Sequence, residues 1–65
     1  MVLNFFLIGT GTTIVAAFQD FPLAEETAYH LSKIDKGKTY KLRNFETGTV
    51  HEYFNGVHVD RYEKT

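Results

Sequence analysis

Cysteine is absent from this chain of 65 residues, and proline occurs only once. Without cysteine there is no disulfide to staple the fold and no thiolate to bind a metal ion. A cysteine-free sequence also suits a reducing compartment, so we expect a cytoplasmic protein. A chain this short buries only about 60% of its unfolded surface, so its stability must come from tight packing or from a partner subunit.

An excess of charge of either sign is also missing, since 7 basic and 8 acidic residues leave a net charge of −1. Strong nucleic-acid binders usually carry a basic excess, and an inhibitor that mimics DNA would need a marked acidic excess. The composition therefore argues against recognition by bulk charge. Local charge patterns remain as a basis for recognition.

A long uninterrupted hydrophobic run is the third feature that the sequence lacks. The most apolar stretch, residues 2–18, contains Asn4, two glycines and three threonines, and it has no positively charged segment at its start. It is shorter than the ~20 apolar residues that span a bilayer, and it does not fit the plan of a signal peptide. We therefore expect no membrane segment.

What the sequence does contain is a hydrophobic periodicity that changes from strand to helix and back. Hydrophobic residues make up 43% of the chain and aromatic residues 15%, which indicates a globular protein. One amphipathic helix of about 13 residues is expected to begin at Pro22, with Asp20 or Phe21 as its cap and Gly37 just beyond its end. Strand patterns cover residues 2–8, 12–18, 38–45, 49–54 and 57–62. Residues 1–65 are thus predicted to form a single α+β domain, with a β-hairpin, one helix and a three-stranded antiparallel meander (ββαβββ).

The pattern of apolar residues in the first two strands and in the helix predicts what each of them packs against. Both strands of the hairpin are apolar at nearly every position, which favours central strands or a face covered by another chain. The side of the helix that contains Tyr29 and Ser32 is expected to face solvent. The apolar side is expected to comprise Leu23, Ala24, Thr27, Ala28, Leu31 and Ile34.

Asn55-Gly56 is the strongest local signal in the chain, because a type I′ hairpin turn needs a positive φ at both central residues. A second hairpin loop of three residues is expected at Glu46-Thr47-Gly48, with the glycine in the left-handed region. These two turns fix the strand pairing. The predicted pairs are Phe54–Val57, Tyr53–His58, Glu52–Val59, His51–Asp60, Arg43–His51 and Lys41–Tyr53.

Alternation along the strands then divides the side chains between two faces. The face expected under the helix carries Tyr40, Leu42, Val50, Phe54, Val57 and Val59. The opposite face is expected to carry Lys41, Arg43, Phe45, His51, Tyr53, His58, Asp60 and Tyr62. Glu52 falls on the apolar face, where a carboxylate needs a partner. We expect either a Glu52–Arg61 pair at the rim or a functional carboxylate in a small pocket.

No catalytic site emerges from this map. The pair His51–Asp60 resembles part of a catalytic site that would also need a serine or cysteine nucleophile. The chain has no cysteine, and Ser32 is its only serine. His51, His58 and Asp60, with His30 on the helix, would converge on a metal ion only at a dimer interface. We therefore predict no enzymatic activity, no cofactor and no metal.

Residues 8–13 form a glycine–threonine segment with two interpretations. The segment has glycines, as phosphate-binding loops do, but it lacks the lysine of a P-loop and the third glycine of a dinucleotide fingerprint. A chain of this length also leaves no room for a nucleotide-binding domain around it. A hairpin turn is the better interpretation.

The polar face supplies the functional prediction. Tyr, Phe, His and Arg on a flat sheet are typical of an interface, so we expect a non-catalytic module that binds a protein partner, including a second copy of itself, unless this face is merely solvated. The expected contact residues are Lys41, Arg43, His51, Tyr53, His58 and Tyr62. The alternative is binding of RNA or single-stranded DNA, with Phe45, Tyr53 and Tyr62 stacked on bases and Lys41 and Arg43 on phosphate. Asp60 within the face argues against that alternative.

Overall fold

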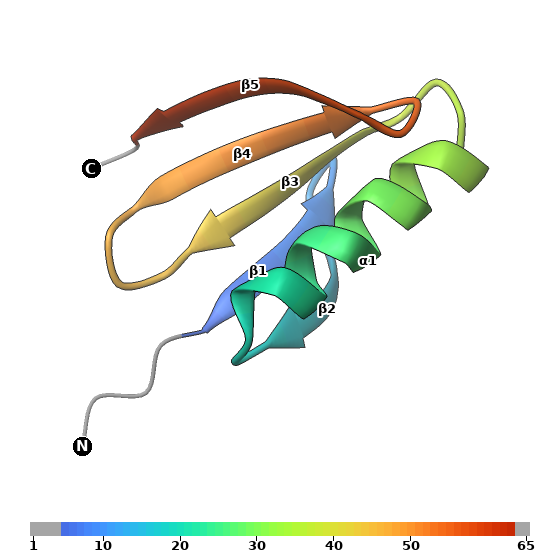
Figure 1. Cartoon of the computed structure of the whole chain (residues 1–65). Helices are drawn as coiled ribbons and strands as arrows, with labels where there is room; N and C mark the ends of the chain where they lie inside the picture. The colour runs from blue at the N-terminus through green and yellow to red at the C-terminus, as the bar shows by residue number, and fades with distance from the viewer. Residues whose placement is uncertain (1–4, 64–65) are drawn as a thin grey trace.

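The computed structural model describes residues 5–63, which form five strands and one helix. The elements are β1 (Phe6–Thr10), β2 (Thr13–Phe18), α1 (Phe21–Ile34), β3 (Thr39–Asn44), β4 (Thr49–Phe54) and β5 (Val57–Glu63). The strands make one antiparallel sheet in the order β2-β1-β3-β4-β5, and α1 lies across one face of it (Figure 1). The predicted α+β class and element order are confirmed. The N-terminal hairpin joins the meander because β1 pairs with β3.

The first hairpin turns at Gly11 and Thr12. Gly11 has a φ of 60°, the sign that the first central residue of a type II′ turn requires. β1 runs through Gly9 to Thr10, so the break between the strands is shorter than predicted, and the predicted strand residues 2–4 lie outside the described part of the chain. β1 is central, as its apolar sequence predicts, whereas β2 is an edge strand that leaves Ile14 and Val15 exposed.

The helix begins at Phe21, one residue before the predicted start at Pro22, and is held at both ends. Asp20 is the N-cap, and its Oδ2 accepts a hydrogen bond from the Leu23 N–H at 3.4 Å. After 14 residues the helix ends at Asp35, whose carboxylate accepts a 2.7 Å hydrogen bond from the Tyr40 hydroxyl on β3. Gly37 has a φ of 89° and lies two residues beyond this cap. Within residues 5–63, no helix has the length and apolar character needed to cross a membrane.

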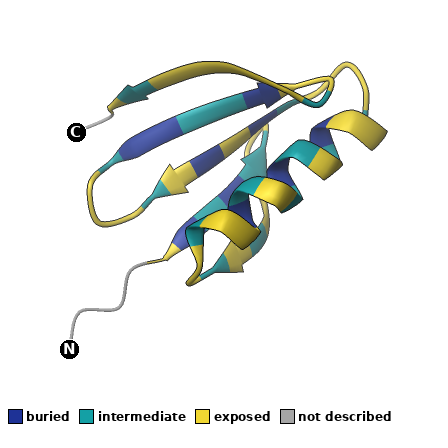
Figure 2. Cartoon of the chain, in the orientation of Figure 1, coloured by how far each residue is buried: buried dark blue, intermediate teal, exposed yellow. Residues whose placement is uncertain are grey.

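The core lies between α1 and the centre of the sheet, where Figure 2 shows buried residues on both layers. The predicted core positions Tyr40, Leu42 and Val50 are confirmed as buried. β4 contributes Tyr53, which has no exposed surface, although the sequence assigned it to the polar face. The buried cluster comprises Phe6, Ile8, Ala24, Ala28, Tyr40, Leu42 and Tyr53.

The helix packs on the sheet through small side chains and is rotated relative to the predicted orientation. Ala24, Ala28 and Ser32, spaced four residues apart, are fully buried and let the helix approach the strands closely. Leu23 and Ile34, predicted to be in the core, are 49% and 64% exposed. The predicted exposure of Ser32 is therefore wrong, because close packing favours small residues over the bulkier apolar ones at this interface.

The β3–β4 loop has four residues, 45–48, rather than three, because Asn44 starts the turn one residue early. The Asn44 Oδ1 accepts hydrogen bonds from the N–H groups of Glu46 and Thr47 at 3.0 and 3.3 Å. Leu42 therefore pairs with His51, and the predicted Arg43–His51 and Lys41–Tyr53 pairs are wrong. A shift of one residue moves side chains to the other face, so His51 and Tyr53 lie on the same side as α1.

The Asn55-Gly56 turn is confirmed, with φ values of 54° and 78°. The pairs Phe54–Val57 and Tyr53–His58 are also confirmed, but a β-bulge at Val59 shifts the pairing beyond them. Glu52 then lies opposite Asp60 and His51 opposite Arg61, so the predicted Glu52–Val59 and His51–Asp60 pairs are wrong. The same change of face puts Val50, Phe54 and Val57 on the side away from α1, not under the helix as predicted. Val50 is nevertheless buried there, with an exposed fraction of 1%. Val57 and the bulge residue Val59 are 58% and 52% exposed.

Candidate functional site

The six predicted contact residues lie on two different faces of the sheet. Lys41, Arg43 and Tyr62 lie on the face away from α1, which we call the open face, whereas His51, Tyr53 and His58 lie on the helix side. Tyr53 is fully buried and offers no surface to a partner. The single aromatic and basic face expected from the sequence is therefore two separate groups of side chains, one on each side of β4.

The open face consists of rows of side chains that the strand pairing places side by side. One row contains Ala17, Leu7, Arg43, Val50 and Tyr62. The next row contains Ile14, Gly9, Lys41, Glu52 and Asp60, and a short third row contains Thr39, Phe54 and Val57. Positive charge is thus confined to β3 and negative charge to β4 and β5. Among residues 5–63 no second layer covers this face (Figure 1).

Glu52 lies on the open face, not on the apolar face under the helix as predicted, and it has partners there. The Tyr62 hydroxyl donates a 2.6 Å hydrogen bond to the Glu52 Oε2, and the Lys41 Nζ lies 4.0 Å from the same oxygen. The hydrogen bond to Glu52 raises the pKa of Tyr62 above its ordinary value of 10.0. The predicted Glu52–Arg61 pair is wrong, because Arg61 lies opposite His51 on the other face.

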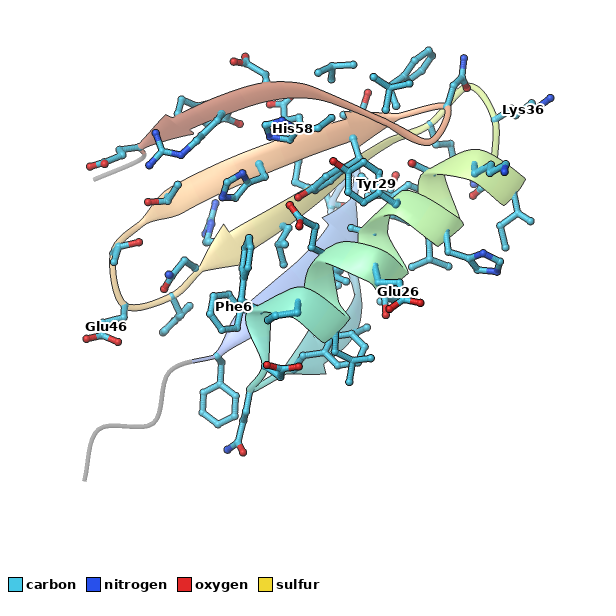
Figure 3. All side chains as sticks on the ribbon, viewed as in Figure 1. Phe6, Glu26, Tyr29, Lys36, Glu46 and His58 are labelled. Carbon is cyan, nitrogen blue, oxygen red and sulfur yellow. The ribbon has the colours of Figure 1, made fainter. Side chains whose placement is uncertain are left out.

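A second group of polar side chains fills the space between α1 and the β4–β5 hairpin. The Tyr53 hydroxyl donates a 3.2 Å hydrogen bond to the Glu25 Oε2, and the Tyr29 ring meets the Tyr53 ring edge-on with centroids 4.7 Å apart. Figure 3 shows Tyr29 directed from the helix toward the sheet, on which His58 lies. Burial, reinforced by the negative charge of Glu25, raises the pKa of Tyr53 far above 10.0. Its hydroxyl therefore stays protonated and ties the helix to the central strands.

His51 and His58 form a pair beside Tyr53. The His51 Nδ1 lies 3.2 Å from the His58 Nε2, and the two ring centroids are 5.2 Å apart. A hydrogen bond at this distance needs one nitrogen to donate and the other to accept, so at least one ring is neutral. Burial lowers the pKa of His51 below 6.5, and the charges of His58 and Arg61 lower it further, while Glu25 acts in the opposite direction.

The contacts that the structure shows in this cluster are ring packing and hydrogen bonds. Within the described range, no three His, Asp or Glu side chains are grouped so as to hold a metal ion. Asp60 lies on the open face, and its Oδ1 accepts a hydrogen bond from the Arg61 N–H at 2.8 Å, so the sheet separates it from His51. His30, the remaining candidate ligand, is exposed on the helix.

Sequence reasoning missed three helix residues that position the meander, namely Glu25, Tyr29 and Ser32. The Ser32 Oγ accepts a 2.9 Å hydrogen bond from the Gly56 N–H, which anchors the tip of the β4–β5 hairpin on the helix. The available signal was the spacing of Ala24, Ala28 and Ser32, which places small residues in one line along the helix. No comparable signal marks Glu25 as the partner of Tyr53.

Comparisons with known proteins find no counterpart: no protein-family model matches the chain, and neither a curated protein nor a solved structure is significantly similar to it.

Proposed function

We propose that this domain is a small non-catalytic interaction module that binds a second copy of itself through the open face. The observation that supports this proposal is a five-stranded sheet that, within residues 5–63, has a helix on one face and nothing on the other. The uncovered face combines apolar side chains with Tyr62, Lys41, Arg43 and two carboxylates. Tyr and Arg are enriched at protein interfaces, whereas Lys, Glu and Asp are depleted there, so the last three need partners of opposite charge in a second copy.

The pattern of charge on the open face is self-complementary. Sheets that pack face to face keep their strand directions within about 30° of each other. A two-fold axis parallel to the strands and between β3 and β4 would set β3 of each copy against β4 of the other. Because such an axis keeps each row opposite itself, Lys41 would face Glu52 of the second copy, and Leu7 would face Tyr62 of the second copy. Each contact would occur twice, as a closed two-fold dimer requires.

The size of the molecule fits this arrangement. A standard interface buries about 800 Å² on each partner, which is roughly a fifth of the 4438 Å² of accessible surface of this chain. A chain of 65 residues without a disulfide also has a small core, so a second copy would add apolar burial that the monomer lacks.

Binding of RNA or single-stranded DNA remains the alternative, but the separation of the aromatic residues weakens its basis. Of the three rings expected to stack on bases, Tyr53 is buried and Phe45 lies in the β3–β4 loop, which leaves Tyr62 on the open face. Glu52 and Asp60 beside it would repel phosphate. A titration with single-stranded oligonucleotides at low salt tests this alternative.

The absence of cysteine also supports a reducing compartment, and we propose that the module acts in the cytoplasm without a cofactor. A tagged chain followed through cell fractionation tests the compartment. Recovery of the chain in an oxidising compartment would contradict this part of the proposal, because the absence of cysteine would then say nothing about where the protein acts.

Light scattering over a wide range of protein concentration tests self-association. The wild-type chain is expected to show a mass that rises to that of a dimer. Arg43→Glu, on the open face, is expected to weaken association about tenfold because it adds repulsion at the interface. Lys36→Glu, the same change of charge on an exposed residue beyond α1, serves as the control and should leave association unchanged. A monomer at every concentration would refute the proposal.

A further inference from the structure

A pocket of about 170 Å³ opens on the open face beside the β1–β2 hairpin. Its walls are residues 11–14 of the hairpin, Leu7 and Gly9 on β1, and Lys41 and Arg43 on β3. Two cationic side chains thus stand on one side of a concave site, and two threonines stand on the other. No acidic side chain is among the described residues that line it.

Gly9 lines the pocket at the point where it interrupts a row of side chains. Gly9 lies between Ile14 and Lys41 in that row and has no side chain to fill the space between them. A Cβ atom at Gly9 would come within 2.9 Å of the Thr13 carbonyl oxygen, closer than such atoms approach. Only glycine therefore fits at this position, where the β1 backbone passes close to β2 next to a β-bulge.

Both cations have spare capacity to bind a ligand. Lys41 and Arg43 are alternate residues of β3, so both project from the same face. The Lys41 Nζ is 4.0 Å from Glu52, the outer limit of an ion pair, and both side chains keep contact with solvent. Among residues 5–63, Arg43 has no ion pair at 4.0 Å or less. Its guanidinium presents a planar pair of donors that matches a carboxylate or a phosphate.

We propose that this pocket is a binding site for an oxyanion, a carboxylate or a phosphate group, held by Arg43 and Lys41 with the Thr12 hydroxyl as a further donor. The glycine–threonine segment lacks a lysine of its own, but the sheet places two cations from β3 next to it. The site is a small anion pocket on a sheet and not a nucleotide-binding loop at the start of a helix.

The oxyanion has two sources that share this chemistry. One is a free anion, such as inorganic phosphate. The other is the Asp60 carboxylate of a second copy, because the two-fold arrangement proposed above sets β5 of one copy over β1 of the other and keeps the row of Asp60 opposite Gly9. This second source rests on the proposed self-association, whereas the preference of the pocket for an oxyanion does not.

The test is an NMR titration of dilute protein with inorganic phosphate at constant ionic strength. The amide signals of Gly9, Gly11 and Thr12 are expected to shift saturably, and Arg43→Gln and Lys41→Gln are each expected to weaken binding about tenfold. Lys36→Gln, away from the pocket, is the control for a general charge effect. Unchanged signals elsewhere in the spectrum show that each variant is folded. Shifts that do not saturate, or that persist in both pocket variants, would overturn the proposal.

A second arm identifies the source. If phosphate lowers the dimer mass and Asp60→Asn weakens association, the carboxylate of the second copy occupies the pocket. If phosphate binds saturably to a chain that stays monomeric, or leaves the dimer intact, the pocket takes a free anion and the Asp60 contact is refuted. Failure of self-association and failure of the anion site are therefore separate results, since the first is read from mass and the second from the amide shifts.

Discussion

The Tyr53 hydroxyl donates a hydrogen bond to Glu25 across the interface between sheet and helix, at 3.2 Å. Tyr53 has no exposed surface, whereas Glu25 is partly exposed. The bond therefore links a strand in the interior of the sheet to a helix residue that keeps contact with water. This contact and the Tyr29 ring beside it hold α1 over the β3–β4 region.

Replacing Tyr53 with Phe removes this hydrogen bond while keeping the ring. We expect a loss of about 1 kcal/mol in the free energy of unfolding, because Glu25 regains water as a partner. Urea denaturation of wild type and Tyr53→Phe measures it. Tyr62→Phe, which removes a hydrogen bond at the less buried Tyr62–Glu52 contact, is expected to change stability less. Equal losses in the two variants would contradict the claim that the more buried Tyr53–Glu25 hydrogen bond contributes more to stability than the Tyr62–Glu52 hydrogen bond.

The same residue predicts how stability changes in alkali. The pKa of Tyr53 is raised above 10.0 in the folded protein, so the folded state holds this proton more tightly than the unfolded state does. The resulting stability is complete below pH 10 and is lost as the pH rises above it. Thermal unfolding between pH 9 and pH 12 should show a steeper decline for wild type than for Tyr53→Phe. Parallel declines would show that Tyr53 ionises as freely in the folded chain as in the unfolded one.

His51 predicts the opposite dependence on the acid side. Its pKa is lowered below 6.5, so below that pH the unfolded state binds more protons and the folded state loses stability as the pH falls toward the folded pKa. An NMR titration should place the His51 transition below pH 6.5. In His58→Gln the transition should move upward, because a neighbouring positive charge is removed. A His51 pKa that is the same in both proteins would contradict the pairing of the two rings.

The hydrogen bond between Ser32 and Gly56 is expected to contribute to stability by docking the β4–β5 hairpin on the helix. In Ser32→Ala, the Gly56 N–H loses the partly buried partner that it has at 2.9 Å. We expect a destabilisation of about 1–2 kcal/mol, the usual penalty for leaving a shielded donor without an acceptor. Hydrogen exchange should show faster exchange at Gly56 and little change in β1. An unchanged Gly56 rate would mean that the turn is not anchored to the helix.

The local features of the fold could be predicted from the sequence because each depends on a few adjacent residues. The Asp20 cap, the helix start to within one residue and the positive φ at Asn55 and Gly56 follow from side chains that act on their own backbone. The order ββαβββ follows from the periodicity of each segment. Even the burial of Tyr40 and Leu42 on β3 could be predicted from alternation within one strand.

Which side chains of β4 and β5 point to which face of the sheet could not be predicted. That assignment depends on one extra residue in the β3–β4 loop and one in β5, and neither is marked by the alternation of apolar and polar residues. The Asn44 side chain caps the β3–β4 loop and lengthens it by one residue, and Val59 adds a bulge in β5. The first shift moves His51 and Tyr53 to the helix side. The polar character of both faces concealed the error, since Tyr53, His51 and Glu52 suit a solvated surface as well as a hydrogen-bonded interior.

Mixing two charge-reversed variants tests the central claim, that the open face joins two copies with β3 against β4, most directly. Lys41→Glu alone and Glu52→Lys alone should each associate weakly, since each would set like charges against each other twice. Mixed in equal amounts, they should form a heterodimer in which both contacts are again between opposite charges, and light scattering should recover the wild-type dimer mass. A mixture that stays monomeric while the wild type dimerises, or single variants that associate as tightly as the wild type, would contradict it.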